Sequence, residues 1–311
     1  MTADLRSKFE SDGAVMLRGI LSHEHIDMFA KQSDLFRIRY SDVQKGLEGC
    51  PARASSGVLA AWAELLEAKD WVLNVQLAPK VHQALEDILE DEPVGRWSHF
   101  VFQSPGTLPQ FRDSAETAHV HNLGLDSDPR GKVIIGWTPV DDVSPDAGPM
   151  WIVPGSHKRF SQFSDELFAA NPVLLNELQE MWRQGAPAEQ WQAWTLRCED
   201  RSKPIFSQFL SLSGNARQPV LLKKGDLLLF SPALLHGTCI ARSPEIPRRA
   251  IISQYQAANC QLWEIGDGAG QHKNANGPGY YKFKEWEKTS HGLTDPTSRY
   301  RHYSSMKGYL H

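Results

Sequence analysis

The sequence has no long apolar run, no paired-cysteine motif and no excess of basic charge. No stretch reaches the roughly 18 apolar residues of a membrane-spanning helix, and the polar N-terminus, MTADLRSKFESDG, lacks the apolar segment of a signal peptide. The four cysteines form no C-x-x-C pair, which favours free thiols in a reducing compartment. The formal net charge of −4 gives no footprint for nucleic acid or an anionic membrane. We therefore expect a cytoplasmic protein that binds neither nucleic acid nor membrane.

The composition is that of an ordinary globular protein, and we expect one domain over residues 1–311. Hydrophobic residues make up 41% of the chain and charged residues 23%, which argues against disorder. Residues 1–95 show mostly helical patterns. The clearest is PKVHQALEDILED, in which Pro79 suits the first turn and Val81, Leu85 and Leu89 lie on one apolar stripe.

The character of the sequence changes at about residue 96. Short β-branched or aromatic runs, such as RWSHFVFQ, KVIIGWTPV and RRAIISQYQ, are separated by glycine, proline and aspartate turns up to about residue 257. Strands punctuated in this way predict a mainly β sandwich or barrel with flanking helices. Residues 159–214 have helical patterns and are interpreted as an insertion between strands. Residues 258–311 are expected to form an irregular tail or a flap over a cleft.

Two histidines stand two positions apart in the stretch TAHVHNLGLDSD. Alternate side chains leave the same face of an extended strand, so His119 and His121 could bind one metal ion together. His236 follows another apolar strand in KKGDLLLFSPALLHGT, and Arg248 and Arg249 open the strand in PRRAIISQY. Each of these residues is a weak signal when it is taken alone.

Taken together and in order, these motifs resemble the phytanoyl-CoA dioxygenase family. The stretches that carry the resemblance are WTPVDDVSPDAGPMWIVPGSHK, KKGDLLLFSPALLHGT and PRRAIISQY, within residues 96–255. The resemblance implies a double-stranded β-helix, a jelly roll of the cupin type, in which a facial triad of ligands holds Fe(II). It also implies 2-oxoglutarate as cosubstrate and O2 as oxidant. The layout is similar to the branch that contains carrier-protein-dependent halogenases.

The resemblance assigns roles to individual residues. His119 becomes the first metal ligand, His236 the distal histidine, and Arg248 the anchor of the far carboxylate of 2-oxoglutarate, because a guanidinium pairs with a carboxylate through two parallel hydrogen bonds. Arg249 is the neighbouring alternative, and strand alternation allows only one of the two to face the pocket. Trp137 is expected near the cosubstrate.

The chain departs from the family at the third ligand, where H-V-H replaces H-x-D. His121 is too bulky to leave room for a halide, which argues against halogenation. A neutral imidazole also raises the formal charge of the metal centre, and three histidines suit zinc, copper or nickel as well as iron. His121 could bind the metal, swing away from it, or belong to a site that has lost iron. Asp126 and Asp128, expected in a loop, could supply a carboxylate only through a long fold-back.

The sequence thus predicts an Fe(II)- and 2-oxoglutarate-dependent oxygenase with a three-histidine metal site. The expected reaction is hydroxylation, or a desaturation, cyclisation or rearrangement, of a small molecule such as a specialised metabolite, either free or tethered to a carrier. One alternative is a zinc or other metal-dependent hydrolase or isomerase on the same fold. The other is a non-catalytic binding protein that kept the fold.

Overall fold

The architecture is taken from a computed structural model of the chain. It describes the following residues, to which every statement on structure refers: 2–28, 30–31, 52–55, 58–62, 78–103, 114–121, 125–129, 131–184, 188–212, 214–243, 245–246, 248–264, 271–274 and 281–282.

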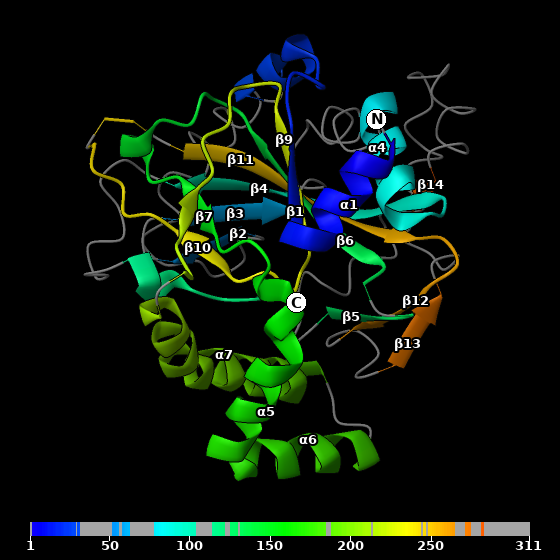
Figure 1. The fold of residues 1–311 in the computed structure, drawn as a ribbon, viewed down its shortest axis with the longest axis vertical. Helices are drawn as coiled ribbons and strands as arrows, with labels where there is room; N and C mark the ends of the chain where they lie inside the picture. The colour runs from blue at the N-terminus through cyan, green and yellow to red at the C-terminus, as the bar shows by residue number, and fades with distance from the viewer. Residues whose placement is uncertain are drawn as a thin grey trace.

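An antiparallel sheet of eight strands forms the larger layer of the molecule (Figure 1). Seven strands run in the spatial order β1, β9, β6, β11, β4, β3, β2, and β14 pairs with β4. Their bounds are β1 Ala14–Leu17, β2 Ala52–Ser55, β3 Val58–Trp62, β4 Pro93–Gln103, β6 Val133–Pro139, β9 Leu227–Phe230, β11 Arg248–Ala257 and β14 Tyr281–Lys282. Strands β2 and β3 form a hairpin, but most other neighbours in the sheet are far apart in the sequence, so the sheet joins the two halves of the chain.

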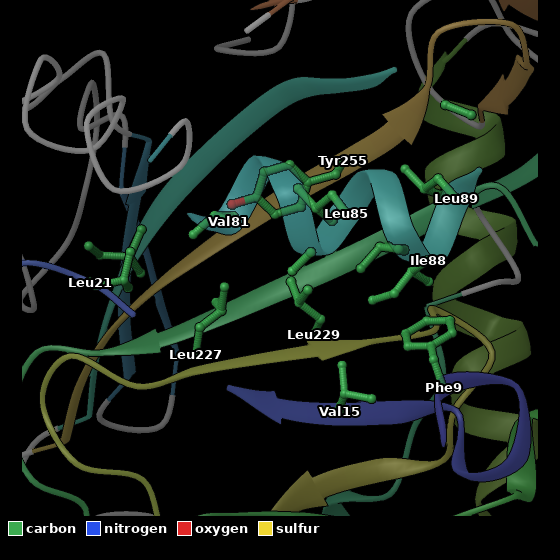
Figure 2. Close-up of a cluster of buried hydrophobic side chains, with 14 of the residues drawn as sticks. Phe9, Val15, Leu21, Val81, Leu85, Ile88, Leu89, Leu227, Leu229 and Tyr255 are labelled. Atoms are coloured by element: carbon green, nitrogen blue, oxygen red, sulfur yellow. The ribbon is translucent and has the colours of Figure 1, made fainter. Parts of the chain in front are cut away.

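Two helices cover one face of this large sheet. Helix α1 (Thr2–Asp12) ends at Gly13, whose positive φ of 75° suits glycine, and helix α4 (Pro79–Leu89) begins with a proline at its first turn. The apolar stripe of α4 lies over Leu227 and Leu229 of β9 and Tyr255 of β11 (Figure 2). Burial of this stripe removes apolar surface from water, which is the main force that holds α4 on the sheet.

The other face of the large sheet packs against a smaller sheet of three strands. Its order is β10, β7, β8, with β7 at Met150–Ile152, β8 at Gln218–Pro219 and β10 at His236–Thr238. Side chains alternate along β9, since Leu227 and Leu229 face the helices while Leu228 and Phe230 join a cluster with Met150 and Ile152 of β7. The second core therefore lies between the two sheets.

Helices α5 (Phe160–Ala170) and α7 (Ala188–Ser211) cover the outer face of the small sheet, and α6 (Pro172–Gln184) packs on these two helices. The three helices lie together at one end of the view in Figure 1. Phe163 of α5 and Phe206 and Phe209 of α7 pack on Trp151 of β7. This segment occupies the part of the chain for which the sequence predicts a helical insertion.

A third sheet contains segments for which loops or an irregular tail were expected. Its order is β13, β12, β5, with β5 at Leu125–Asp128, β12 at Gln261–Glu264 and β13 at Gln271–Asn274. Asp126 and Asp128 therefore lie in a strand, and the expectation of a loop there was wrong. Pairing with a partner more than 130 residues away makes this strand, and a four-residue polar segment carries no hydrophobic alternation that would predict it. No helix in the described parts of the chain is long and apolar enough to cross a membrane.

Candidate metal centre

His119 and His236 face each other across a short antiparallel contact. The amide of His119 donates to the carbonyl of His236 at 2.9 Å, and the amide of His236 donates to the carbonyl of His119 at 3.1 Å. His119 thus adds a one-residue pairing to the small sheet, beside the first residue of β10. The two backbones are thus held in register, and the imidazole ring centroids lie 4.2 Å apart.

His121 joins the pair through strand-like alternation of the chain. Val120 is buried among the side chains under helices α5 and α7, which turns His119 and His121 towards the opposite side. The amide of His121 donates to the carbonyl of Pro232 at 2.7 Å. Its Nε2 lies 3.2 Å from Nε2 of His236. The H-V-H motif therefore behaves as the spacing predicts.

The three rings each bring one nitrogen to a common region. One ring nitrogen from each of the three histidines lies within 4.8 Å of the others, and among the described residues this is the one group of three or more His, Cys, Asp or Glu side chains that could hold a metal ion. Nδ1 of His119 lies 2.9 Å from the carbonyl oxygen of Thr117, and Nδ1 of His236 lies 2.8 Å from that of Leu234. A carbonyl only accepts hydrogen bonds, so both Nδ1 atoms carry the proton and each Nε2 keeps a lone pair with which it can bind a metal.

Burial keeps His236 in the form that a metal needs. Its side chain is only 3% exposed, and this burial, together with the neighbouring His119 and His121, lowers the pKa of His236 well below its usual value. The ring is therefore neutral at neutral pH, as a metal ligand must be. Phe230 of β9 stands edge-on to it, with ring centroids 5.0 Å apart, and shields one side of the site from water.

Arg248 is a buried cation in the interior between the two sheets. Its side chain shares a face of β11 with Ala250, and only 7% of the residue is exposed. Its Nη1 donates to the carbonyl of Gly148 at 2.9 Å, and its guanidinium lies 6.0 Å from the ring centroid of Trp137. Within the described residues its Nε has no hydrogen-bond partner, and burial lowers the pKa of Arg248 to about 10. A guanidinium with a free donor in an interior of this kind suits an anionic ligand.

Arg249 points to the other face of β11 and has a different partner. Its Nε donates to Asp141 Oδ2 at 2.7 Å and its Nη2 to Asp141 Oδ1 at 2.5 Å, so the carboxylate holds the guanidinium at two points. The two arginines thus divide as strand alternation requires. Asp141 is thus the ion-pair partner of Arg249.

The metal centre and Arg248 border one interior. Phe230, which contacts His236 and His121, belongs to the same buried cluster as Trp137, which lies beside Arg248. The same apolar region between the two sheets is therefore bordered by four of the polar residues that the sequence singled out, which are His119, His121, His236 and Arg248. Sequence reasoning missed Phe230 and Thr117; the phenylalanine lies in the motif that ends with His236, and the threonine lies two residues before His119.

Comparison with known proteins gives a family and a fold. A family model described as phytanoyl-CoA dioxygenase (PhyH) matches residues 9–250. A search of curated proteins finds no significant match.

Three solved structures of similar fold are informative. The carbocyclase SnoK from nogalamycin biosynthesis, described as non-heme and alpha ketoglutarate dependent, is 16% identical, with a TM-score of 0.59 over 90% of this chain and 96% of its own. The epimerase SnoN in complex with Fe3+, alpha ketoglutarate and nogalamycin RO is 13% identical, with a TM-score of 0.55 over 90% and 97%. EctD from S. alaskensis with bound Fe is 15% identical, with a TM-score of 0.55 over 87% and 85%. At such identities the likeness establishes the fold, and the predicted cofactors, iron and 2-oxoglutarate, are present in similar structures.

Proposed function

The chain belongs to the phytanoyl-CoA dioxygenase family of Fe(II)- and 2-oxoglutarate-dependent dioxygenases, and from this membership we propose that it oxidises a small molecule at a three-histidine iron site. His119, His121 and His236 hold the metal in this proposal. Arg248 binds the far carboxylate of 2-oxoglutarate, and Trp137 lies beside that carboxylate. The two packed sheets then form a double-stranded β-helix that places both groups on one interior.

The observation that carries the proposal is the convergence of two sets of groups, each suited to a ligand. One ring nitrogen from each of the three histidines lies within 4.8 Å of the others, and the Nδ1 atoms of two of the rings bond to backbone carbonyls. The buried Arg248 keeps a donor without a partner among the described residues. A metal ion satisfies the first set and a carboxylate satisfies the second. 2-Oxoglutarate carries a metal-chelating end and a distant carboxylate, so it fits both requirements.

Each residue has a distinct task in the reaction. Bound iron and 2-oxoglutarate would supply the oxidation of a substrate C–H bond by O2, one oxygen atom going to the substrate and the other to succinate, which forms from 2-oxoglutarate with loss of CO2. The histidines fix the position of the metal, Arg248 fixes the orientation of the cosubstrate, and Phe230 excludes water from one side of the metal centre. The protein thereby holds the reacting groups in register, which is where most of its contribution to the rate lies.

The structures of similar fold support one substrate class for this proposal. SnoN and SnoK belong to nogalamycin biosynthesis, and this favours a specialised metabolite, free or tethered to a carrier, as the substrate of this chain. Hydroxylation is the default outcome. Epimerisation and ring closure, the activities named for SnoN and SnoK, are the alternatives that product analysis should include.

Anaerobic titration with Fe(II) and 2-oxoglutarate tests the proposal directly. We expect a visible charge-transfer band from the iron-bound chelate, and succinate when O2 is admitted. Arg248→Met should lose the band at moderate 2-oxoglutarate while it still binds Fe(II). If the native protein shows no band and forms no succinate but retains Zn(II) tightly, the zinc hydrolase or isomerase replaces the oxygenase. If it retains neither metal, the binding protein does.

A further inference from the structure

Thr117 uses its hydroxyl to join the His119 segment to strand β10. The amide of Thr238 donates to Thr117 Oγ1 at 2.8 Å, and the same hydroxyl donates to the carbonyl of Thr238 at 3.0 Å. One side-chain hydroxyl therefore serves both the donor and the acceptor of one strand residue, which is the pattern of a backbone pair.

The backbone conformation at Thr117 explains why its side chain, and not its peptide group, pairs with Thr238. His119 pairs with His236, so an antiparallel ladder continued by two residues would place Thr117 opposite Thr238. At this point, however, the chain is already in the short 3-10 helix Ser114–Thr117. The hydroxyl takes the place of the missing peptide group and continues the pairing past the metal ligand.

The same residue controls the ring of His119. The carbonyl of Thr117 accepts the hydrogen bond from Nδ1 of His119 at 2.9 Å. The hydroxyl thus holds the residue whose carbonyl selects the Nδ1–H tautomer and turns Nε2 to the metal position. A Cβ added at Gly237 would lie 2.5 Å from Thr117 Oγ1 and 2.4 Å from the ring of Trp151, so the glycine permits this close approach.

His236 obtains its orientation differently. Its Nδ1 bonds to the carbonyl of Leu234, whose own amide donates to Ser231 at 2.9 Å, while the amide of Leu235 donates to the hydroxyl of Ser156 at 2.9 Å. A turn and a buried hydroxyl therefore support this second ligand. The carbonyl of Thr117, which orients His119, lies instead at the end of a 3-10 helix. The hydroxyl of Thr117 links this end of the helix to the small sheet.

We propose that Thr117 is a positioning residue of the metal centre, whose hydroxyl keeps His119 in the tautomer and orientation that bind the metal. The inference rests on the three-histidine site of the proposed function but not on iron, 2-oxoglutarate or oxygen chemistry. It predicts that removal of the hydroxyl lowers metal affinity through His119 and leaves the rest of the fold in place.

Co(II) binding to the full-length protein tests the inference without turnover. Thr117→Val keeps the shape of the side chain and removes the hydroxyl, and it should weaken Co(II) binding by about 10- to 100-fold, the usual cost of removing a partner behind a metal ligand. Thr117→Ser keeps the hydroxyl and should restore near-native affinity. Thr138→Val makes the same change at a buried threonine of β6, on the helix-covered face of the large sheet, and should bind Co(II) as the native protein does.

A second measurement follows His119 itself. In 15N spectra of the metal-free protein, native His119 should show the Nδ1–H tautomer, and Thr117→Val should show a mixture of tautomers while His236 keeps its signal. Thermal unfolding checks that the variants are folded; if Thr117→Val does not fold, Thr117→Ala replaces it. Unchanged Co(II) affinity, an unchanged His119 tautomer, or a native protein that binds no Co(II) would overturn the inference. Normal Co(II) results with no 2-oxoglutarate band would overturn the proposed function alone.

Discussion

Replacing Arg248 with methionine should stabilise the protein without ligands and strongly reduce its stabilisation by 2-oxoglutarate. Methionine has an unbranched side chain that fills irregular interior space and carries no charge. Arg248 is buried between the sheets, its Nε has no described partner, and among the described residues no carboxylate pairs with it. A group in such a position costs stability, and a ligand-binding role explains why it is there.

The magnitude follows from the pKa of Arg248, which burial lowers to about 10. Compared with the ordinary arginine value of about 12.5, this corresponds to a cost of about 3 kcal/mol for a charged Arg248 in the folded protein. Loss of the hydrogen bond to the carbonyl of Gly148 returns about 1.5 kcal/mol of that gain. Arg248→Met should therefore raise the free energy of unfolding by about 1–2 kcal/mol, or a few degrees in melting temperature.

The pH dependence of this gain has a definite sign. A base whose pKa is lowered by folding carries its full penalty at pH values below the folded pKa, and the penalty is relieved as the pH rises through that value. The stabilisation by Arg248→Met should therefore be constant through neutral pH and shrink above about pH 10.

The same substitution should weaken the stabilisation of the protein by 2-oxoglutarate. With Fe(II) under anaerobic conditions, 2-oxoglutarate at a hundred times its Kd should stabilise the native protein by about 2.7 kcal/mol. Loss of charged hydrogen bonds worth about 1.5–3 kcal/mol each raises Kd by about 100-fold, so the same concentration should stabilise Arg248→Met by only about 0.4 kcal/mol. Urea unfolding with and without 2-oxoglutarate measures both effects. A variant that is less stable than the native protein and still responds fully to 2-oxoglutarate would refute the reasoning.

Three further changes have expected outcomes. Arg249→Met removes the ion pair with Asp141 and should lower the free energy of unfolding by about 1 kcal/mol, while isothermal titration shows unchanged 2-oxoglutarate binding. His121→Ala should weaken Fe(II) binding and His121→Asp should strengthen it, as followed by anaerobic metal titration; equal affinity of native and alanine proteins would show that His121 is no ligand. Gly237→Ala places a Cβ 2.4 Å from the ring of Trp151, and thermal unfolding should reveal a loss of about 1–3 kcal/mol.

Strands β6, β9 and β11 were predictable because their residues alternate between two cores, whereas β2 and β3 lie in residues 1–95, where mostly helical structure was expected. In β9, leucines at 227 and 229 face the helices and residues 228 and 230 face the small sheet, so a continuous apolar run marks a strand buried on both sides. The H-x-H spacing was informative for the same reason, since alternation with a buried Val120 places both rings on one side.

Contacts between distant segments were beyond prediction from one sequence. Strand β5 exists because it pairs with β12, and its polar residues carry no signal of that pairing. Strand alternation predicted only that Arg248 and Arg249 face opposite sides of their strand. Which of the two lies inside depends on their partners. Thr117 escaped notice because its role depends on Thr238, which is 121 residues away.

In the proposed site, the charges account for an imidazole where the family pattern has a carboxylate. A divalent ion held by three neutral histidines keeps both of its positive charges, and Arg248 adds another to the same interior. Like charges repel strongly at the low effective dielectric of a protein interior, and a dianion that contacts both groups offsets that repulsion. A carboxylate at position 121 would already cancel one charge of the metal before the cosubstrate arrives. Binding of 2-oxoglutarate and binding of the metal should therefore support each other more strongly in the native chain than in His121→Asp, by the reciprocity that couples any two ligands.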